Sequence, residues 1–400
     1  MSRNRFEKIT SHLHFTDNDQ ATDELKQDKC WKVRPWLSSL RQNMLLVAQE
    51  KKSAVDEILI PFRGRCNIRQ YMPSKPKSKW GIKVLARAGE SGICYDFDVY
   101  QRCNKGVYGY QEGYQLGLGA GVVLQLCTSL PGRADNLIVP DNFFTSPQLV
   151  SELTTKGISF VGTVRENRLQ SRKLMDEKSM KKRGRGTHDF SVTSCGDKSL
   201  IAVKWFDNRS VTTLSNCCGI EPVVAVRRWD KKAKDHVLVD CPAIIPTYNS
   251  SMGGVDLLDK MCFSYRFALR SKRWYVYLFW HTVKIAAVNA WFLHKRIAQQ
   301  QRHPSVPLRV FVDELASSLV LFQMRPAGRH SGEHLPPAKK LAASIPRDVR
   351  GDETAHWPVW NTKRSRCKMC TSGYTFIACS KCNMSRCLNK DHNCFVAFHR

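Results

Sequence analysis

The order of strand and helix patterns between residues 53 and 164 constrains the fold of this chain more than any other feature. Strand patterns occur at 54–60, 79–86, 93–100, 137–139 and 158–164, and helical patterns at 117–130 and 146–155. The first three strands follow one another through short turns, which is typical of an antiparallel meander. The order β-β-β-α-β-α-β therefore predicts an α/β domain.

The rest of the chain divides by composition and periodicity. Helical rhythms fill residues 1–50, and residues 166–247 begin with a basic stretch and continue with strand-like runs. Residues 325–355 are rich in proline, glycine and charge, which is typical of a linker. We expect a helical part at 1–50, an α/β core at 51–165 and 248–324, a β-rich insertion at 166–247, a linker at 325–355 and a cysteine-rich domain at 356–400.

The charge balance indicates a polyanionic partner. Lys and Arg number 63 against 35 Asp and Glu, a net charge of +28, and 42% of the residues are hydrophobic. The hydrophobic fraction is sufficient for a buried core. The positive charge favours nucleic acid over a membrane surface as the partner. Trp274 to Leu293 has the length of a membrane span, but Lys284 near its centre favours a buried or groove-lining helix. No membrane partner is predicted, and the N-terminus has no apolar signal core.

Acidic residues stand at structurally special positions in this basic chain. Asp56 lies inside a strand pattern, and Asp141 follows the end of another. Asp256 and Asp259, in Gly253-Gly254-Val255-Asp256-Leu257-Leu258-Asp259, share one helical face because they are three residues apart. Such acids can converge at a sheet edge and hold Mg²⁺ or Mn²⁺ for two-metal phosphoryl transfer. Taken alone, the pattern arises more often from helix caps and salt bridges.

The last 34 residues contain six of the 16 cysteines, at positions 367, 370, 379, 382, 387 and 394. Paired Cys-x2-Cys spacings allow two thiolates to bind one Zn²⁺ in tetrahedral geometry. With His399 the cysteines make seven ligands, and His356 or else His392 supplies the eighth. We therefore predict two structural Zn²⁺ ions in a compact cross-braced module; a disulfide knot is the alternative.

Two basic segments are candidate DNA contacts. Arg266, Arg270, Lys272 and Arg273 follow the acidic helix directly, where cations can bind phosphates beside the acids. The alternative is a solvated turn before a core helix. The run Lys181-Lys182-Arg183 is interpreted as a DNA contact, a nuclear-localisation patch or a solvated loop.

The amino-acid sequence resembles the piggyBac family of DNA transposases. The matching fragments lie in the family's order over nearly the whole chain: Met1–Phe6, Leu13–Phe15, Val55–Glu57, Ile60–Arg65, Gln70–Pro73, Lys79–Lys83, Asp141–Ser146, Gly162–Arg165 and Gly253–Asp259. The resemblance implies an RNase H-like catalytic core, which the predicted element order also fits. It further implies a β-rich insertion before the last catalytic segment and a C-terminal cysteine-rich domain that recognises transposon-end DNA.

The resemblance also implies a site. Its three catalytic aspartates fall on Asp56, Asp141 and Asp256, and Asp259 matches a fourth acid near the metals. The implied chemistry is metal-dependent hydrolysis of double-stranded DNA at a transposon end, a hairpin intermediate and insertion at TTAA targets. Asp96, Asp98 and Asp207 fall outside the matching positions and are interpreted as surface or turn acids.

The family further implies a nuclear protein that acts as a homodimer. Its members usually carry a longer N-terminal lead, so residues 1–50 are expected to be a truncated dimerisation and DNA-binding region. Many relatives are domesticated. The alternative function is therefore a catalytically silent nuclear protein that keeps the fold and binds DNA or chromatin proteins.

Overall fold

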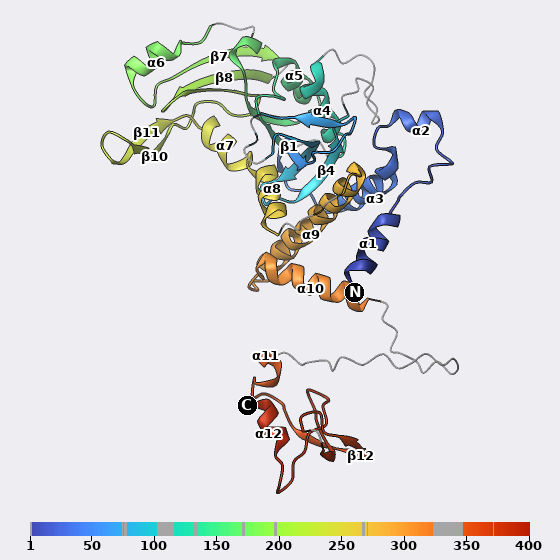
Figure 1. Ribbon diagram of the computed structural model, residues 1–400. Coiled ribbons are helices and arrows are strands. Elements are labelled where there is room, and N and C mark those ends of the chain that lie inside the picture. The colour runs from blue at the N-terminus through green and yellow to red at the C-terminus, as the bar shows by residue number, and fades with distance from the viewer. Residues whose placement is uncertain are drawn as a thin grey trace. The chain divides into compact units, whose positions relative to one another are not determined.

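The computed structural model describes residues 2–73, 75, 78–101, 116–130, 135–169, 173–195, 198–265, 269, 271–322, 347–370 and 372–400. These residues form two compact units, Met1–Gln323 and Met324–Arg400 (Figure 1). Among the described residues, no helix is long and apolar enough to cross a membrane.

A mixed sheet forms the centre of the first unit. Its strands are β1 (Lys52–Pro61), β2 (Arg69–Tyr71), β3 (Trp80–Gly89), β4 (Cys94–Val99), β5 (Leu137–Pro140), β6 (Ser159–Thr163), β7 (His188–Cys195), β8 (Lys198–Phe206) and β9 (Ser210–Ser215). Strand β3 pairs antiparallel with both β1 and β4, whereas β5 is parallel to β1 and β6 is parallel to β5. The predicted meander and the two later strands are therefore all members of one sheet.

The insertion continues this sheet instead of forming a separate body. Strand β6 pairs with β9, β9 with β8, and β8 with β7, all antiparallel. Only the hairpin of β10 (Val224–Asp230) and β11 (Asp235–Cys241) stands apart as a two-stranded sheet. The five strands β7 to β11 all lie within the range 166–247.

Helices cover both faces of the sheet. In chain order they are α1 (Arg3–His12), α2 (Asp23–Gln27), α3 (Arg34–Leu45), α4 (Gly117–Cys127), α5 (Pro147–Thr155), α6 (Glu177–Arg183), α7 (Ile244–Ser251), α8 (Gly254–Ser264), α9 (Trp274–Gln300) and α10 (Leu308–Leu321), with short 3₁₀ turns at Trp31–Val33 and Glu166–Arg168. The helical patterns predicted within residues 1–50 correspond to α1 and α3.

The two faces of β1 belong to different cores. Ala54, Ile58 and Ile60 pack with residues of α3, α8 and α9 in one cluster. Val55 joins a second cluster with residues of α4 and α5. Because successive side chains of a strand point to opposite faces, Asp56 shares the α8 side with Ala54 and Ile58. A strand that is buried on both faces is a costly place for a carboxylate.

The second unit is a small module around a hairpin. Its elements are α11 (Arg347–Arg350), β12 (Pro358–Arg366), β13 (Tyr374–Cys379) and α12 (Cys394–His399), and β12 pairs antiparallel with β13. The helix α11 lies inside the predicted linker range of 325–355. Asp352, also in that range, contacts His356, so the module begins before residue 356.

Candidate active site and metal-ligand clusters

The strand β1 presents Asp56 toward α8. Asp56 pairs in register with Ala86 of β3, and the Glu57 backbone N–H donates to Asp56 Oδ1 over 2.7 Å. Burial, and after it the negative charges of Glu57 and Asp256, raise the pKa of Asp56 to about 7. A cation near this position would therefore favour the charged form of the carboxylate.

The end of β5 places Asp141 beside that position. Pro140 pairs with Val55 in the parallel register of β1 and β5, so Asp141 follows next to Asp56 along the neighbouring strand. The Thr163 hydroxyl at the end of β6 donates to Asp141 Oδ1 over 3.2 Å. Parallel strands meet at the same edge, which is why two acids 85 positions apart in the chain become neighbours.

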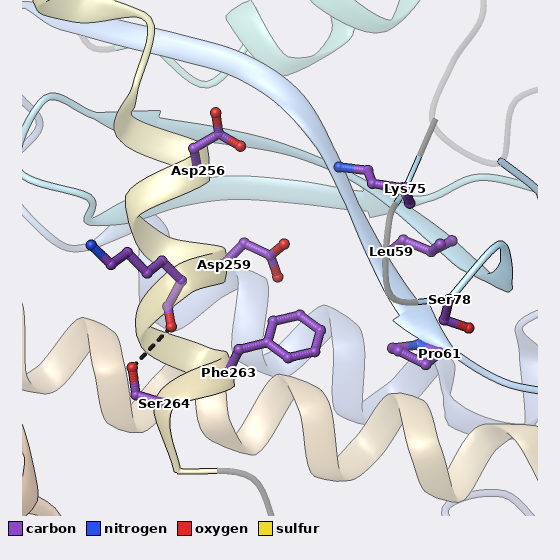
Figure 2. A pocket seen from close by; sticks show the side chains of 9 residues that line it. Leu59, Pro61, Lys75, Ser78, Asp256, Asp259, Phe263 and Ser264 are labelled. Carbon is purple, nitrogen blue, oxygen red and sulfur yellow. Dashed lines mark hydrogen bonds between the residues drawn. The ribbon is translucent and has the colours of Figure 1, made fainter. Parts of the chain in front are cut away.

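The helix α8 supplies the other two acids. It packs against β1 and β3 through its buried residues Val255, Leu258 and Cys262. Asp256 and Asp259 line one cavity of about 460 Å³, shown in Figure 2. The apolar positions of the Gly253–Asp259 motif therefore anchor the helix, and its two acids border the cavity.

A lysine borders the same cavity. Figure 2 shows Lys75 across from Asp256 and Asp259, with Phe263 and Pro61 toward the other end. The positive charge of Lys75 acts on Asp56 in the direction that lowers the carboxyl pKa, although burial dominates. Asp56 and Asp141 are not among the residues that line the cavity.

A tyrosine of α7, Tyr248, lies near this site. Its hydroxyl is 3.4 Å from the Thr163 hydroxyl. Burial raises the Tyr248 pKa first, and the negative charges of Asp141, Asp56 and Asp256 raise it further. The negative charges of Asp56 in β1, Asp141 after β5 and Asp256 in α8 therefore all act on the Tyr248 hydroxyl.

The interpretation of Asp96 as a surface or turn acid was wrong. Its side chain is fully buried in β4, where Arg41 Nε and Nη2 bind its carboxylate at 2.5 and 2.8 Å. Asp98 faces Arg34, and Asp207 pairs with Arg185 at 2.6 Å. These acids are paired with arginines inside the fold, and strand alternation alone did not reveal their partners.

The predicted basic contacts divide into three groups. Arg266 and Arg270 lie outside the described residues. Arg273 donates to the Thr10 and Ser11 carbonyls at 2.5 and 3.0 Å, so its guanidinium joins α1 to the start of α9. Lys272 is exposed, as are the three basic residues Lys181, Lys182 and Arg183 at the end of α6.

The cysteines of the second unit form two groups of four potential ligands. One group contains Cys367, Cys370, Cys387 and Cys394, and the other contains His356, Cys379, Cys382 and His399. Within each group all ligand atoms lie within 4.8 Å of one another. The groups interleave along the chain, and His356, not His392, is the eighth member.

The two histidines are oriented for ligation. His356 Nδ1 lies 3.2 Å from Cys379 Sγ, while its Nε2 lies 2.9 Å from Asp352 Oδ1. His399 Nδ1 lies 2.8 Å from the Phe395 carbonyl, and its Nε2 is buried without a hydrogen-bond partner among the described residues. A buried imidazole nitrogen beside thiols is a donor set that suits a soft divalent ion such as zinc.

Sequence reasoning did not identify several residues of these sites. Tyr248 and Thr163 lie near the acids only because α7 and β6 meet at the sheet edge, so no local signal marks them. Lys75 stands in a lysine-rich stretch between two strand patterns, and that clustering was a usable signal. Asp352 stands four residues before His356, and this spacing was a usable signal for a carboxylate that contacts the histidine ring.

Comparisons with known proteins agree with this architecture. A family model described as Transposase IS4 matches residues 1–291. The fold resembles a solved structure titled "Cryo-EM structure of piggyBac transposase synaptic complex with hairpin DNA", with a TM-score of 0.65, 23% identity and coverage of 98% of this chain and 80% of that one. The sheet and the acids thus belong to a protein of the transposase class.

Curated relatives narrow the class. PiggyBac transposable element-derived protein 3 of Homo sapiens is 31% identical over all of this chain and 63% of its own length. PiggyBac transposable element-derived protein 2 of Homo sapiens is 28% identical over 92% of this chain and 59% of its own length. The chain belongs to the piggyBac transposase family, and it spans about three fifths of the length of these two relatives.

Proposed function

We propose that this chain is a piggyBac-type transposase, or a domesticated descendant, that cleaves and joins double-stranded DNA at its Asp56, Asp141, Asp256 and Asp259 site. The observation that carries the proposal is the placement of three acids on adjoining elements: Asp56 lies in β1, Asp141 follows the parallel neighbour β5, and Asp256 lies in α8, which packs against β1. The solved relative was captured with hairpin DNA, and the net charge of +28 suits the same partner here.

The sheet supports an RNase H-like core as part of the proposal. Three antiparallel strands, β4, β3 and β1, are followed by β5 and β6 parallel to β1, which gives the spatial order β4-β3-β1-β5-β6. Asp56 lies in β1, between β3 and β5 in this order, and Asp141 follows the end of β5. The acids assigned to the site therefore stand on neighbouring parallel strands.

The acidic cluster fits a divalent cation. The raised pKa of Asp56 has burial as its first cause and neighbouring negative charge as its second, and a bound cation opposes both. Asp56, Asp141 and Asp256, with Asp259 beside them, would hold Mg²⁺ or Mn²⁺. Bound there, such ions supply activation of the attacking oxygen and stabilisation of the leaving oxygen.

The surrounding residues have distinct tasks in this proposal. Thr163 fixes the orientation of the Asp141 carboxylate through its hydroxyl. Lys75, across the cavity from the α8 acids, offers a cation to a phosphate that enters between them. The helix α8 keeps Asp256 in place because its apolar side is anchored in the core.

The C-terminal module belongs to the proposal as a two-zinc domain. Cys367, Cys370, Cys387 and Cys394 would hold one Zn²⁺, and His356, Cys379, Cys382 and His399 the other, in a cross-braced arrangement. Closed sites of this kind are structural. Metal analysis of the purified chain should find two zinc ions per chain, and Cys→Ser changes should reduce this number; a zinc-free folded module would overturn the assignment.

A cleavage experiment tests the catalytic part. A labelled duplex with a piggyBac-type end and a TTAA flank is incubated with Mg²⁺ and either the wild type or Asp256→Asn. We expect a nick and a hairpin from the wild type alone. Binding without cleavage by both proteins would support instead the catalytically silent DNA- or chromatin-binding function. Nuclear location and homodimerisation follow from the same proposal and are tested by imaging and by mass measurement in solution.

A further inference from the structure

A basic surface lies on the insertion, where no catalytic role has been assigned. The end of α6 and the β10–β11 hairpin present exposed cations, and we call this the arm surface: Lys181, Lys182, Arg183, Arg227, Lys231, Lys232 and Lys234. Figure 1 shows the hairpin extending beyond the rest of its unit, on the side where α6 also lies. The turn of the hairpin, residues 231–234, carries three of these seven cations.

Internal ion pairs neutralise nearby acids and fix the surface in place. Arg185, just after α6, binds Asp207 at 2.6 Å and Asp230 at 3.3 Å, and it also donates to the Trp229 carbonyl. Arg228 lies 3.7 Å from Asp207. These two arginines are partly buried and hold the hairpin to the segment that follows α6 and to the turn between β8 and β9, whereas the arm cations remain exposed. The acids left on the hairpin are Asp235 and Asp240.

The two faces of the hairpin differ. Val226 pairs with Val239 and Arg228 with Val237 on the face that packs inward. On the other face Arg227 pairs with Leu238, and Trp229 pairs with His236, whose ring centroid lies 5.3 Å from the indole. Leu238 is 70% exposed and Trp229 is 51% exposed. The outward face therefore combines large apolar side chains with cations.

This combination fits a groove of duplex DNA. The major groove, about 12 Å wide, admits a two-stranded β-ribbon, and exposed lysines beside the ribbon bind phosphates. An acidic protein surface would also attract the cations, but a narrow projecting ribbon with cations at its turn matches the shape of a groove better. Strand β11 leads into α7, whose Tyr248 hydroxyl lies 3.4 Å from the Thr163 hydroxyl that donates to Asp141, so the arm is joined to the site through one helix.

We propose that the β10–β11 hairpin is a DNA-binding arm that enters a groove of duplex DNA outside the cleavage site. Lys231, Lys232 and Lys234 contact phosphates at the turn, and the end of α6 contacts the backbone beside them. Trp229 and Leu238 face the groove. The inference rests on the proposed function, because it takes DNA as the partner, and it adds a surface separate from the acids.

Salt dependence of DNA binding tests the arm. The variant Lys231→Gln/Lys232→Gln/Lys234→Gln is compared with Lys231→Arg/Lys232→Arg/Lys234→Arg, which keeps the charge. Each phosphate contact contributes roughly 0.9 to the slope of log K against log salt concentration, so three lost contacts should reduce the slope of the Gln variant by about 2.7. The Arg variant should keep the wild-type slope. With Mg²⁺ present, the cleavage rate of the Gln variant on short duplexes that end near the cut should differ little from that of the wild type.

The outcomes separate the two proposals. If the wild type cleaves DNA and the Gln variant has an unchanged affinity and salt dependence, the inference that the hairpin binds DNA is overturned. The proposed function then stands. If neither the wild type nor the Gln variant binds DNA, the DNA-binding arm and the proposed function are both overturned. If the Gln variant loses binding to an acidic peptide but not to DNA, the arm binds protein and the inference is overturned. As a second variant, Trp229→Ala/Leu238→Ala should lower affinity for DNA with little change in slope.

Discussion

The backbone of Gly254, the first residue of α8, lies against the Gly89 carbonyl at the end of β3. A Cβ atom added to Gly254 would be 2.2 Å from the Gly89 oxygen, a distance that no real side chain adopts. The close approach sets how near α8 comes to the sheet and therefore where Asp256 and Asp259 are held. A glycine is needed here because the neighbour is a backbone atom that cannot rotate away.

We expect Gly254→Ala to move α8 away from β3. Overpacking of this kind costs about 1–3 kcal/mol in the free energy of unfolding, and DNA cleavage should fall further because Asp256 is displaced. Gly253→Ala is the matched control: a Cβ there meets nothing within 4 Å, and the cost should stay below about 1 kcal/mol. Urea unfolding measures both. Equal losses in the two variants would contradict the close-approach argument.

The pKa of Asp56 predicts a pH dependence of the metal-free protein. Burial and the charges of Glu57 and Asp256 raise this pKa to about 7 from the ordinary value of 3.8. The folded state therefore binds a proton that the unfolded state has released, so the free energy of unfolding falls as pH rises from about 4 to about 7. Asp56→Asn removes this loss and should be more stable than the wild type at pH 8 in EDTA.

Thermal melts at pH 4.5 and pH 8 check this prediction. The stability gain of Asp56→Asn should be present at pH 8 and nearly absent at pH 4.5, and added Mg²⁺ should stabilise the wild type alone. Asp19→Asn, at an exposed position, is the control and should change neither result. A gain at both pH values would point to packing rather than to charge.

The contact between Asp352 and His356 predicts that Asp352 raises metal affinity by orienting the His356 ring. Asp352 accepts from His356 Nε2 and also pairs with Lys381. A carboxylate in this place holds the ring orientation, and its loss costs about 10–100-fold in metal affinity. Asp352→Asn should therefore release zinc to a chelator more readily. Asp391→Asn, exposed in the same module, should behave as the wild type; equal release from both variants would refute the role of Asp352.

The buried pair of Asp96 and Arg41 predicts a large stability change without a metal effect. Asp96 is fully buried and also accepts from the Ser129 hydroxyl at 2.6 Å. Asp96→Ala removes the carboxylate that binds the Arg41 guanidinium and should cost about 3–5 kcal/mol. The double change Arg41→Met/Asp96→Leu should recover most of this loss in urea unfolding. No recovery would mean that the pair contributes through geometry that apolar residues cannot replace.

Several features of the fold could be predicted from local sequence. The strand patterns at 54–60, 79–86, 93–100, 137–139 and 158–164 all correspond to strands of the central sheet. Apolar runs bounded by turn residues identify these elements, because most positions of strands such as β1, β3 and β4 are buried on both faces. The two Cys-x2-Cys pairs likewise predicted a cluster of metal ligands, because the spacing of two cysteines three residues apart is a local property of the sequence.

Other features depended on contacts between distant segments. The strands β7, β8 and β9 continue the core sheet because β9 pairs with β6, and no pattern within the insertion records that pairing. Asp96 has the same local appearance as an exposed strand acid, and only Arg41, 55 positions away, explains its burial. The choice of His356 over His392 likewise required the folded module.

For this protein, the amino-acid sequence by itself determined the element order, the family, the positions of the acids and the eight ligand residues as a set with one alternative. The tertiary structure decided which acids meet, which are paired with arginine, and how the eight ligands divide into two groups. The physical reason is the range over which each signal acts. Helix and strand periodicity and ligand spacing act over a few residues, whereas the neighbouring positions of Asp56 and Asp141 and the burial of Asp96 beside Arg41 depend on strand order and packing across the whole unit.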